Sequence, residues 1–371
     1  MKAPIRIINE SFDLLGEIED YESFVLTRRW HKAGEFDLSI NINKRNTEFL
    51  QKGNVIFIGN RLDTGGVIMH KEIALSDTGT ASETMLVKGL SLQGYANRRI
   101  TIPPDGHASE TYAAQNVETI MRSLVNNHLV DPTDTDRAMP FLSLADNENK
   151  GDNINFASRY KQLEEELESL STASGLGWGF VLDFDTSSSV FNVLEGVDRT
   201  FGNGVNPQAL FSPDFDNIRS QQLTDSDFGL STWALVAGQG EGADRAAVTV
   251  GEGEGSDRFE MFVDARDLED AADLPDRGEL RLLEMQGVLT LEAQAVPRSG
   301  LVYRQDYDLG DMVTVKNSKW GILLNSRITE AIEIYDSRGF DLQLVFGSSV
   351  PTLAEIVRRR IAQHAGAASF S

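Results

Sequence analysis

Hydrophobic and polar positions alternate along the first hundred residues with the two-residue period of β-strands. The alternation is regular over residues 36–42, and residues 55–58 form a short run in which every position is apolar. Turn-forming pairs such as Gly53-Asn54 separate these runs. Short strands at regular spacing, with no helical period between them, are typical of a barrel or a sandwich. We therefore expect a first β-barrel over residues 1–105.

The period changes to that of helices after the turn at residues 103–106. Apolar side chains recur every three or four positions from Val117 to Val125, which predicts a helix with Ser109 as its N-cap. A second helix is indicated by an apolar face opposite a run of glutamates at residues 164–168; that face is formed by Tyr160, Leu163, Leu167 and Leu170.

Two strands follow these helices. The runs at residues 178–182 and 190–194 predict a hairpin whose loop is residues 186–189. Together with the two helices, this hairpin predicts a small α/β domain over residues 106–204, inserted between two β-rich regions.

Strand patterns resume at about Ala209 and continue to residue 347, interrupted by a short helical insert at about residues 266–288. We expect residues 205–350 to form a second β-rich region that contains a second barrel. Apolar positions at Leu353, Ile356, Val357 and Ile361 predict a last helix within residues 351–371, ending in a frayed tail. The predicted fold class is therefore α+β and mainly β.

A weak internal repeat relates the two β-rich regions. Glycine-punctuated strands run from Gly53 to Gly89 over 37 residues and from Gly310 to Gly347 over 38 residues, in the same order. Any two β-meanders share some punctuation of this kind, so coincidence is one interpretation. The other is that the chain carries two copies of one β-barrel.

Composition narrows the classes of function. The formal net charge is −23, which argues against a basic groove for nucleic acid or a surface for anionic membranes. Hydrophobic residues make up 40% of the chain, as in a folded protein. There is no cysteine, which excludes disulfides, thiolate metal sites and cysteine nucleophiles. No apolar run is long enough to span a membrane, so we expect a soluble protein without an anchor.

The negative charge is concentrated in one part of the chain. Residues 1–105 contain 13 basic and 14 acidic side chains, whereas residues 213–285 contain 6 basic and 18 acidic ones. About half of the excess therefore lies in a fifth of the chain. Such a density requires carboxylates that are solvated or that face a partner favoured by them.

Two loops imitate ligand-binding motifs. Residues 238–242, Gly-Gln-Gly-Glu-Gly, resemble a dinucleotide loop, but the pattern continues into a strand, so a hairpin loop is favoured. Residues 146–152 resemble a calcium loop, but Lys150 occupies a ligand position and Ala157 stands where a bidentate glutamate belongs. We expect a polar loop before a helix there.

Candidate catalytic groups do not form a recognisable set. The five histidines have no metal-binding spacing; they are His31, His70, His107, His128 and His364. The acidic pairs Asp183/Asp185 and Asp264/Asp267 have the residue types of glycosidase carboxylates, but such pairs occur by chance among 57 acidic residues. Arg358, Arg359 and Arg360 fit either a solvated helix end or a contact with an acidic neighbour. We therefore predict no catalytic, cofactor or metal site.

A series of segments along the chain carries a family resemblance. It begins with residues 16–23, Arg28-Arg29-Trp30 and residues 33–38. It continues through residues 87–92, 98–101, 124–127, 131–134, 237–242 and 307–311, and so covers nearly the whole chain. Together these segments resemble a family of siphophage tail-tip hub proteins from tailed phages and prophages of Gram-positive bacteria.

The resemblance implies a structural hub, similar to the N-terminal hub region of tail-associated lysins and to the central hub of contractile tails. Such hubs are homotrimers in which each subunit contributes two related β-barrels, so that three chains present a quasi-sixfold ring to the hexameric distal tail protein. A spike, fibre or tape-measure protein lies on the other side. Location in the virion, assembly in the host cytoplasm and the absence of an enzymatic activity or cofactor are also implied.

If the chain is such a hub, the acidic segment at residues 213–285 has a possible function. DNA that leaves the particle slides through the hub, and a channel lined by carboxylates repels phosphate. The alternative function is a carbohydrate-active enzyme or receptor-binding module of β architecture, which would use an acidic pair and an exposed Trp178 or Trp233.

Overall fold

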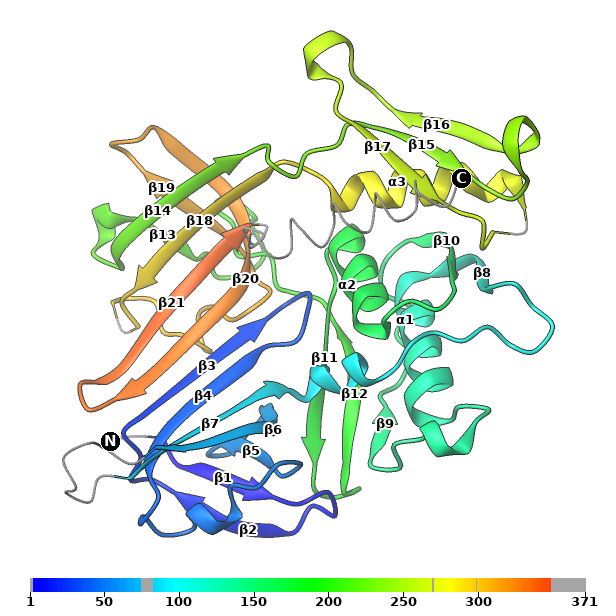
Figure 1. Cartoon of the computed structure of the whole chain (residues 1–371). Helices are drawn as coiled ribbons and strands as arrows, with labels where there is room; N and C mark the ends of the chain where they lie inside the picture. The colour runs from blue at the N-terminus through cyan, green and yellow to red at the C-terminus, as the bar shows by residue number, and fades with distance from the viewer. Residues whose placement is uncertain (1–2, 75–82, 269, 298, 348–371) are drawn as a thin grey trace.

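The computed structural model describes residues 3–74, 83–268, 270–297 and 299–347, and the predicted last helix with its arginines and His364 lies outside them. The fold is mainly β, as expected (Figure 1). The N-terminal half of the large sheet contains β1 (Ile5–Ile8), β2 (Leu14–Ile18), β3 (Ser23–Arg29), β4 (Glu35–Asn41), β5 (Val55–Ile58), β6 (Arg61–Ala74) and β7 (Thr84–Ser91). The C-terminal half contains β13 (Leu210–Phe211), β14 (Ile218–Ser226), β18 (Val288–Ala295), β19 (Met312–Asn317), β20 (Ile322–Asp336) and β21 (Gly339–Gly347).

The two halves have the same strand order. In the first half the neighbours run β3-β4-β7-β6-β5, and in the second they run β14-β18-β21-β20-β19. The long middle strands, β6 and β20, each pair with a short strand along their first part and with a longer one along their second part. The repeat seen in the sequence is therefore a repeat of topology.

The match extends to single residues. The pairing of β6 with β7 shifts register between Ile68 and His70, and that of β20 with β21 shifts between Ile328 and Glu330. The N–H of Gly53 donates to Ile68 O at 2.9 Å, and the N–H of Gly310 donates to Ile328 O at 2.8 Å. Both glycines have positive φ, 94° and 91°. Two coinciding bulges and two coinciding hydrogen bonds identify the halves as copies of one unit.

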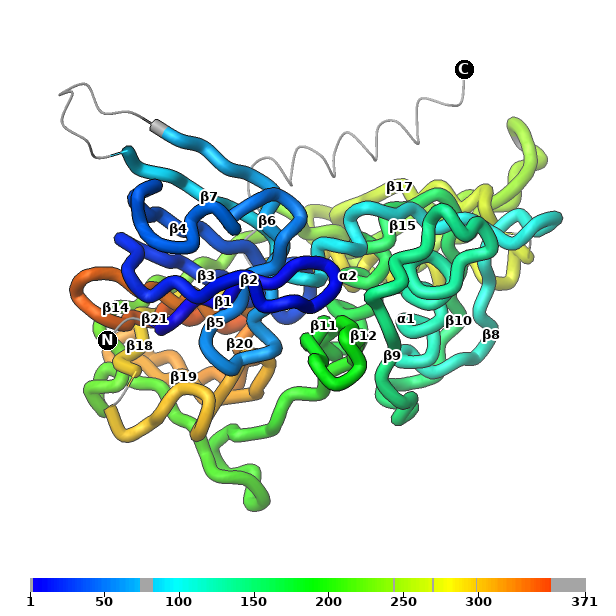
Figure 2. Tube along the Cα trace, turned by 90° about the horizontal axis from the view of Figure 1, so that it is seen from below, coloured from blue at the N-terminus to red at the C-terminus, as the bar shows by residue number. Residues whose placement is uncertain are grey.

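Two separate barrels were expected, but the halves do not form separate closed barrels. Over the described ranges one 13-stranded sheet passes through both of them, and its path begins at β14 and ends at β2 without returning. The halves are joined because β3 of the first pairs with β20 of the second. Figure 2 shows the strands of both halves stacked at one end of the molecule, with the α/β insert at the other.

The insert between the halves contains helices and small sheets. Its elements are β8 (Glu110–Asn116), α1 (Val117–Val125), β9 (Leu142–Leu144), β10 (Asn153–Ser158), α2 (Leu163–Ser174), β11 (Gly177–Asp183) and β12 (Ser188–Leu194). The hairpin of β11 and β12 was predicted correctly, but its loop is residues 184–187 instead of 186–189. The predicted cap was wrong, because Ser109 precedes a strand; Asn116 caps α1 by accepting from the N–H of Glu118 at 3.1 Å.

The second helix differs from its prediction at both faces. Tyr160 lies before α2 and is 59% exposed, so it takes no part in the apolar face. Glu166 is buried at 4% exposure although the pattern placed it in solvent. Leu163, Leu167 and Leu170 are fully buried, as expected. They pack in one core with the outer face of the first half, including Phe57.

A smaller unit interrupts the second half between β14 and β18. Strands β15 (Trp233–Ala237), β16 (Ala247–Gly251) and β17 (Glu260–Asp264) form a sheet of their own, and α3 (Leu274–Glu284) packs on it (Figure 1). The equivalent connection in the first half, between β3 and β4, spans only residues 30–34. Most of the acidic segment therefore belongs to an appendage of the second half.

Candidate functional site

The junction of the two halves contains a network of ion pairs and hydrogen bonds between side chains. Strand β3 pairs antiparallel with β20, with Arg29 opposite Glu330 at one end and Phe24 opposite Tyr335 at the other. The N–H of Trp30 extends the ladder to Thr329 O at 3.0 Å. Every second residue of β20 in this stretch is buried: Ala331, Glu333 and Tyr335. The central one of these positions is therefore occupied by a charged residue, Glu333, instead of an apolar one.

The carboxylate of Glu333 is fully buried and fully satisfied. Arg61 donates two hydrogen bonds of 2.6 Å to its two oxygens. The hydroxyls of Tyr303 and Tyr335 donate to it at 2.9 and 2.7 Å. Burial would raise the pKa of Glu333, but the hydrogen bonds and charge of Arg61 hold that pKa below its usual value. The side chain therefore stays ionised inside the junction.

A second ion cluster lies beside the first. Arg28 of β3 donates to Asp308 at 2.7 Å and to Asp63 at 2.9 Å. Arg304 also donates to Asp63 at 2.9 Å. Burial alone would raise the pKa of Asp63, but Arg28 and Arg304 lower it. These contacts connect the first half to the loop before β19 in the second half.

The chemistry of the junction is that of a structural joint. Each of its carboxylates is held by a guanidinium, so none is free to act as a general acid, base or nucleophile. Arginine pairs of this kind fix geometry because the guanidinium binds a carboxylate through two parallel hydrogen bonds. Removing one partner would leave an uncompensated buried charge.

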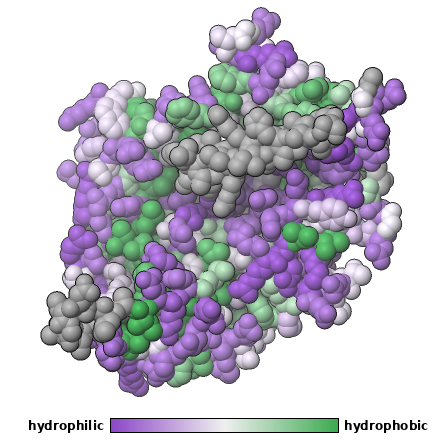
Figure 3. All heavy atoms as spheres, in the orientation of Figure 1, coloured by the Kyte–Doolittle hydropathy of each residue, from purple (hydrophilic) through white to green (hydrophobic). Residues whose placement is uncertain are grey.

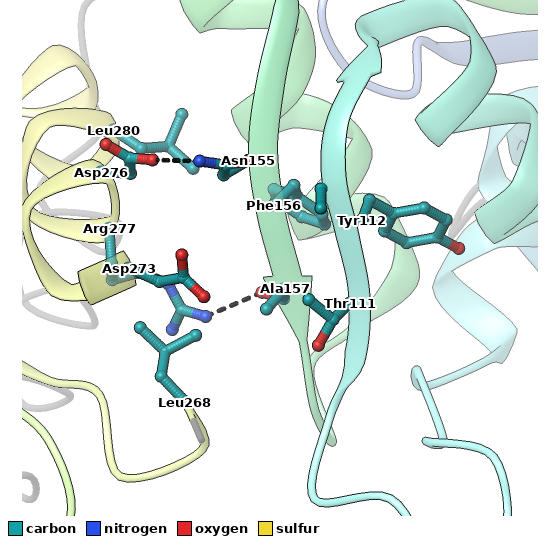
Figure 4. A pocket seen from close by; sticks show the side chains of 11 residues that line it. Thr111, Tyr112, Asn155, Phe156, Ala157, Leu268, Asp273, Asp276, Arg277 and Leu280 are labelled. Atoms are coloured by element: carbon teal, nitrogen blue, oxygen red, sulfur yellow. Dashed lines mark hydrogen bonds between the residues drawn. The ribbon is translucent and has the colours of Figure 1, made fainter. Parts of the chain in front are cut away.

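Two cavities of the described residues lie beside the junction and beside the appendage. A cleft of about 300 Å³ borders the junction, and its polar lining includes Arg28, Asp63 and Asp308, which are engaged with one another. A second cavity, of about 30 Å³, separates β8 and β10 from α3 (Figure 4). Its volume suits one or two water molecules. In it Arg277 donates to Ala157 O at 2.7 Å and Asn155 to Asp276 at 2.8 Å.

The tryptophans of the alternative function are not displayed as expected. Trp178 is 1% exposed, and its indole N–H donates to His31 O at 2.8 Å, so the expectation of an exposed Trp178 was wrong. The ring of Trp233 is covered by the guanidinium of Arg258, 3.9 Å from the ring centre. Trp178 therefore offers no face for stacking on a sugar, and one face of Trp233 is occupied by Arg258.

The acidic pairs have local structural roles. Asp183 accepts from the N–H of Asp185 at 2.9 Å and so closes the turn between β11 and β12. Asp264 forms ion pairs with Arg245 and Arg266, and Asp267 pairs with Arg277. These contacts stabilise the appendage around β17 and α3.

The two loops that resemble ligand-binding motifs form hydrogen bonds with other groups of the same chain. Residues 238–242 connect β15 to β16, so they form a hairpin loop as expected, and Arg245 donates to Gly238 O at 2.7 Å. In residues 146–152 the N–H groups of Glu148 and Lys150 donate to the buried carboxylate of Glu118, at 3.2 and 2.8 Å. This loop precedes strand β10, so the expected helix after it was wrong.

The described histidines are dispersed. His31 is near Ser171 Oγ, 2.7 Å from Nδ1, and burial with the charges of Arg327 and Lys32 lowers its pKa to about 4. His128 contacts Glu110 at 2.7 Å in the α/β insert, whereas His70 and His107 are exposed. Over the ranges that the structure covers, no group of three possible ligands could hold a metal ion. No helix within those ranges is long and apolar enough to cross a membrane.

Sequence reasoning missed the junction residues. One signal was visible: Glu333 interrupts an alternating strand at a position that faces the same side as Ala331 and Tyr335. A glutamate on the apolar side of a strand indicates a buried partner. Its partner Arg61 is 272 residues away and carries no matching signal.

Comparisons with known proteins agree on the fold. The family model described as Siphovirus ReqiPepy6 Gp37-like protein matches residues 4–348. A tail protein from Neisseria meningitidis MC58 has a TM-score of 0.57 at 14% identity, with 94% of this chain and 97% of that chain covered. The 43 kDa tail protein of prophage MuSo2 from Shewanella oneidensis has a TM-score of 0.55 at 12% identity, with 92% and 98% covered.

A third solved structure, the prophage tail protein gp18 from Listeria monocytogenes EGD-e, has a TM-score of 0.55 at 11% identity, with 98% of each chain covered. The curated proteins contain no match to this chain. At these identities the structures demonstrate a shared fold, and each is covered over nearly its whole length.

Proposed function

The chain belongs to the Siphovirus ReqiPepy6 Gp37-like protein family, and we propose that it is the trimeric hub at the tip of a phage or prophage tail. It is a structural phage tail protein with the fold of prophage tail proteins, and so a component of the virion. The hub function, the trimer and the passage of DNA are the steps that we add to this assignment.

The observation that carries the proposal is the duplication of the sheet unit within one chain. Three copies of a chain with two equivalent halves supply six equivalent halves around a threefold axis. Such a ring matches a hexameric distal tail protein on one side. The appendage of β15–β17 and α3 occurs in only one half of each chain, so the other side keeps threefold symmetry, as a spike, fibre or tape-measure protein requires.

We propose that DNA passes through this ring without being bound. Exposed carboxylates lie on both loops next to β16 in the appendage, with Glu241 before this strand and Glu252 and Glu254 after it. A channel bordered by such groups repels the phosphate backbone and offers it no cationic site at which to stop. The hydrophilic character of the face in Figure 3 agrees with a surface that is largely in water.

We propose no enzymatic activity for the chain. The carboxylates engaged by arginines, the buried Trp178 and the guanidinium stacked on Trp233 give the alternative carbohydrate-active function no supporting observation. Assembly in the host cytoplasm, before release of the particle, follows from the same proposal.

Light scattering and negative-stain imaging of the purified protein test the hub. We expect a mass three times 40.9 kDa and threefold rings with a central opening. A monomer whose thermal unfolding temperature rises with a glycan would contradict the hub and support the carbohydrate-binding alternative.

A further inference from the structure

We propose that β6 of one subunit pairs with β14 of the next subunit, in the register that β20 and β3 use inside the chain. The proposal rests on the trimer of the proposed function and names the surface that builds it. Its basis is the residue-by-residue equivalence of the two halves.

Each half has two edges at which another half can pair. One edge is the second part of its long strand, β6 or β20, and the other is its first strand in the shared order, β3 or β14. Inside the chain, residues 330–335 of β20 pair with β3. The counterparts of these two strands are β6 after Ile68, because Ile68 matches Ile328, and β14. In the described part of the chain, β5 pairs with β6 no further than Val67, and β14 pairs with β18 alone. The chain therefore keeps one unused edge of each kind.

The equivalence fixes the register of the missing pair. Within the chain Ala331 lies opposite Arg28 and Glu333 opposite Leu26. Lys71 and Ile73 occupy the positions of Ala331 and Glu333, counted from the shared bulge. Asp225 and Leu223 of β14 occupy the positions of Arg28 and Leu26 of β3. This follows because β14 pairs with β18 as β3 pairs with β4, and β18 and β4 pair in turn with the equivalent strands β21 and β7. These correspondences predict that Lys71 faces Asp225 of the neighbour and Ile73 faces Leu223.

The side chains at these positions are complementary. Ile73 and Leu223 are 51% and 37% exposed, and opposite residues of an antiparallel pair contact each other on one face of the sheet. Pairing would therefore cover two exposed apolar side chains at once. Lys71 and Asp225 carry opposite charges on the same face, next to the apolar pair. The free edges thus carry matched residues in the register that the repeat dictates.

The contact is head to tail and can close a ring. The edge of β14 in one subunit meets the edge of β6 in the next, so each subunit uses both of its free edges once. Inside each chain the step from the first half to the second uses the same kind of contact. A trimer would then contain six junctions of one type, three within chains and three between them.

Disulfide trapping tests the register directly, because the natural chain contains no cysteine. The variant Ile73→Cys/Leu223→Cys places two thiols opposite each other across the proposed contact. After oxidation we expect covalent dimers and trimers on a denaturing gel. The matched control, Ile73→Cys/Gln222→Cys, moves one thiol to the other face of its strand and should give at least tenfold less product.

The outcomes separate this inference from the hub. Light scattering of the reduced variants reports assembly, and the gel reports the contact. A trimer without cross-links, or with equal cross-links in both variants, overturns the pairing and leaves the hub standing. A monomer overturns both.

A charge exchange provides a second test without new bonds. Lys71→Glu and Asp225→Lys should each weaken trimer formation at least tenfold, and the double exchange should restore it. Loss of trimer in the double exchange, or no loss in either single variant, contradicts the register.

Discussion

Arg61 of β6 and Glu333 of β20 form a two-point ion pair between residues that are 272 positions apart in the chain. Glu333 is fully buried at the centre of the contact between the two halves of the sheet, Arg61 is partly buried, and the hydroxyls of Tyr303 and Tyr335 also donate to Glu333. The two copies of the unit are thus joined by one ion pair, to which the first half contributes the arginine and the second half the glutamate.

Removal of the negative charge at position 333 should destabilise the whole chain. Glu333→Gln keeps the shape but leaves Arg61 without its counter-charge, and we expect a loss of about 3–5 kcal/mol in the free energy of unfolding. Urea unfolding followed by tryptophan fluorescence measures it. Arg338→Ala, which removes an exposed ion pair with Asp336, is the control and should leave the midpoint unchanged. A Glu333→Gln midpoint equal to that of the natural protein would refute the prediction.

His31 should make stability depend on pH below neutrality. Its pKa falls to about 4 in the folded state, below the usual value of 6.5, so the unfolded state binds a proton first. The free energy of unfolding should therefore decrease by about 3 kcal/mol between pH 6.5 and pH 4, and this contribution should be constant below that range. His31→Gln should remove this part of the slope in urea titrations at several pH values. His107→Gln, at an exposed site, should retain it; equal slopes for all three proteins would sink the idea.

The equivalent glycines Gly53 and Gly310 offer a matched pair of substitutions. Both have positive φ, but an added Cβ meets nothing within 4 Å at Gly53 and lies 2.1 Å from the ring of Trp30 at Gly310. Gly53→Ala should cost about 1–3 kcal/mol through backbone strain alone. Gly310→Ala should cost a further ~1–3 kcal/mol because the Trp30 ring must move. Thermal unfolding of the two variants tests the difference, which should vanish in a Trp30→Ala background.

Charge reversal on the appendage should affect DNA release if the acidic loops border the channel. Glu241→Lys, Glu252→Lys and Glu254→Lys together create cationic sites for phosphate, and we expect ejection to slow several-fold. The rate of DNA release from triggered particles is the measurement. Particles with Glu19→Lys and Glu48→Lys, which alter exposed acids of the first half, should eject normally. Unchanged ejection in the appendage variant would count against a channel lined by these loops.

The doubled unit could be recognised in the sequence because its signals are local. The glycines at 53 and 310 and the strands that follow them have the same spacing, since each copy needs the same turn and the same bulge. The prediction of a mainly β fold with an inserted hairpin and helices was confirmed for the same reason. The division at residues 105 and 204 stays a prediction.

Features that depend on distant contacts could not be predicted. Separate barrels were expected because the spacing of strands does not show which edges meet, and the pairing of β3 with β20 makes one sheet of two. The burial of Trp178 depends on His31, whose carbonyl accepts its N–H. Ser109 was a reasonable cap by residue type, but the strand from Glu110 to Asn116 postpones the helix.

The pairing of β3 with β20 also constrains the order of events during synthesis. The N-terminal half can form its meander as soon as β7 has left the ribosome, but the edge of β3 stays uncovered until residue 335 has been made. An uncovered edge strand pairs readily with other chains. The nascent protein therefore has an unpaired edge strand during most of its translation. Slow translation of the last part of the chain would favour aggregation over assembly.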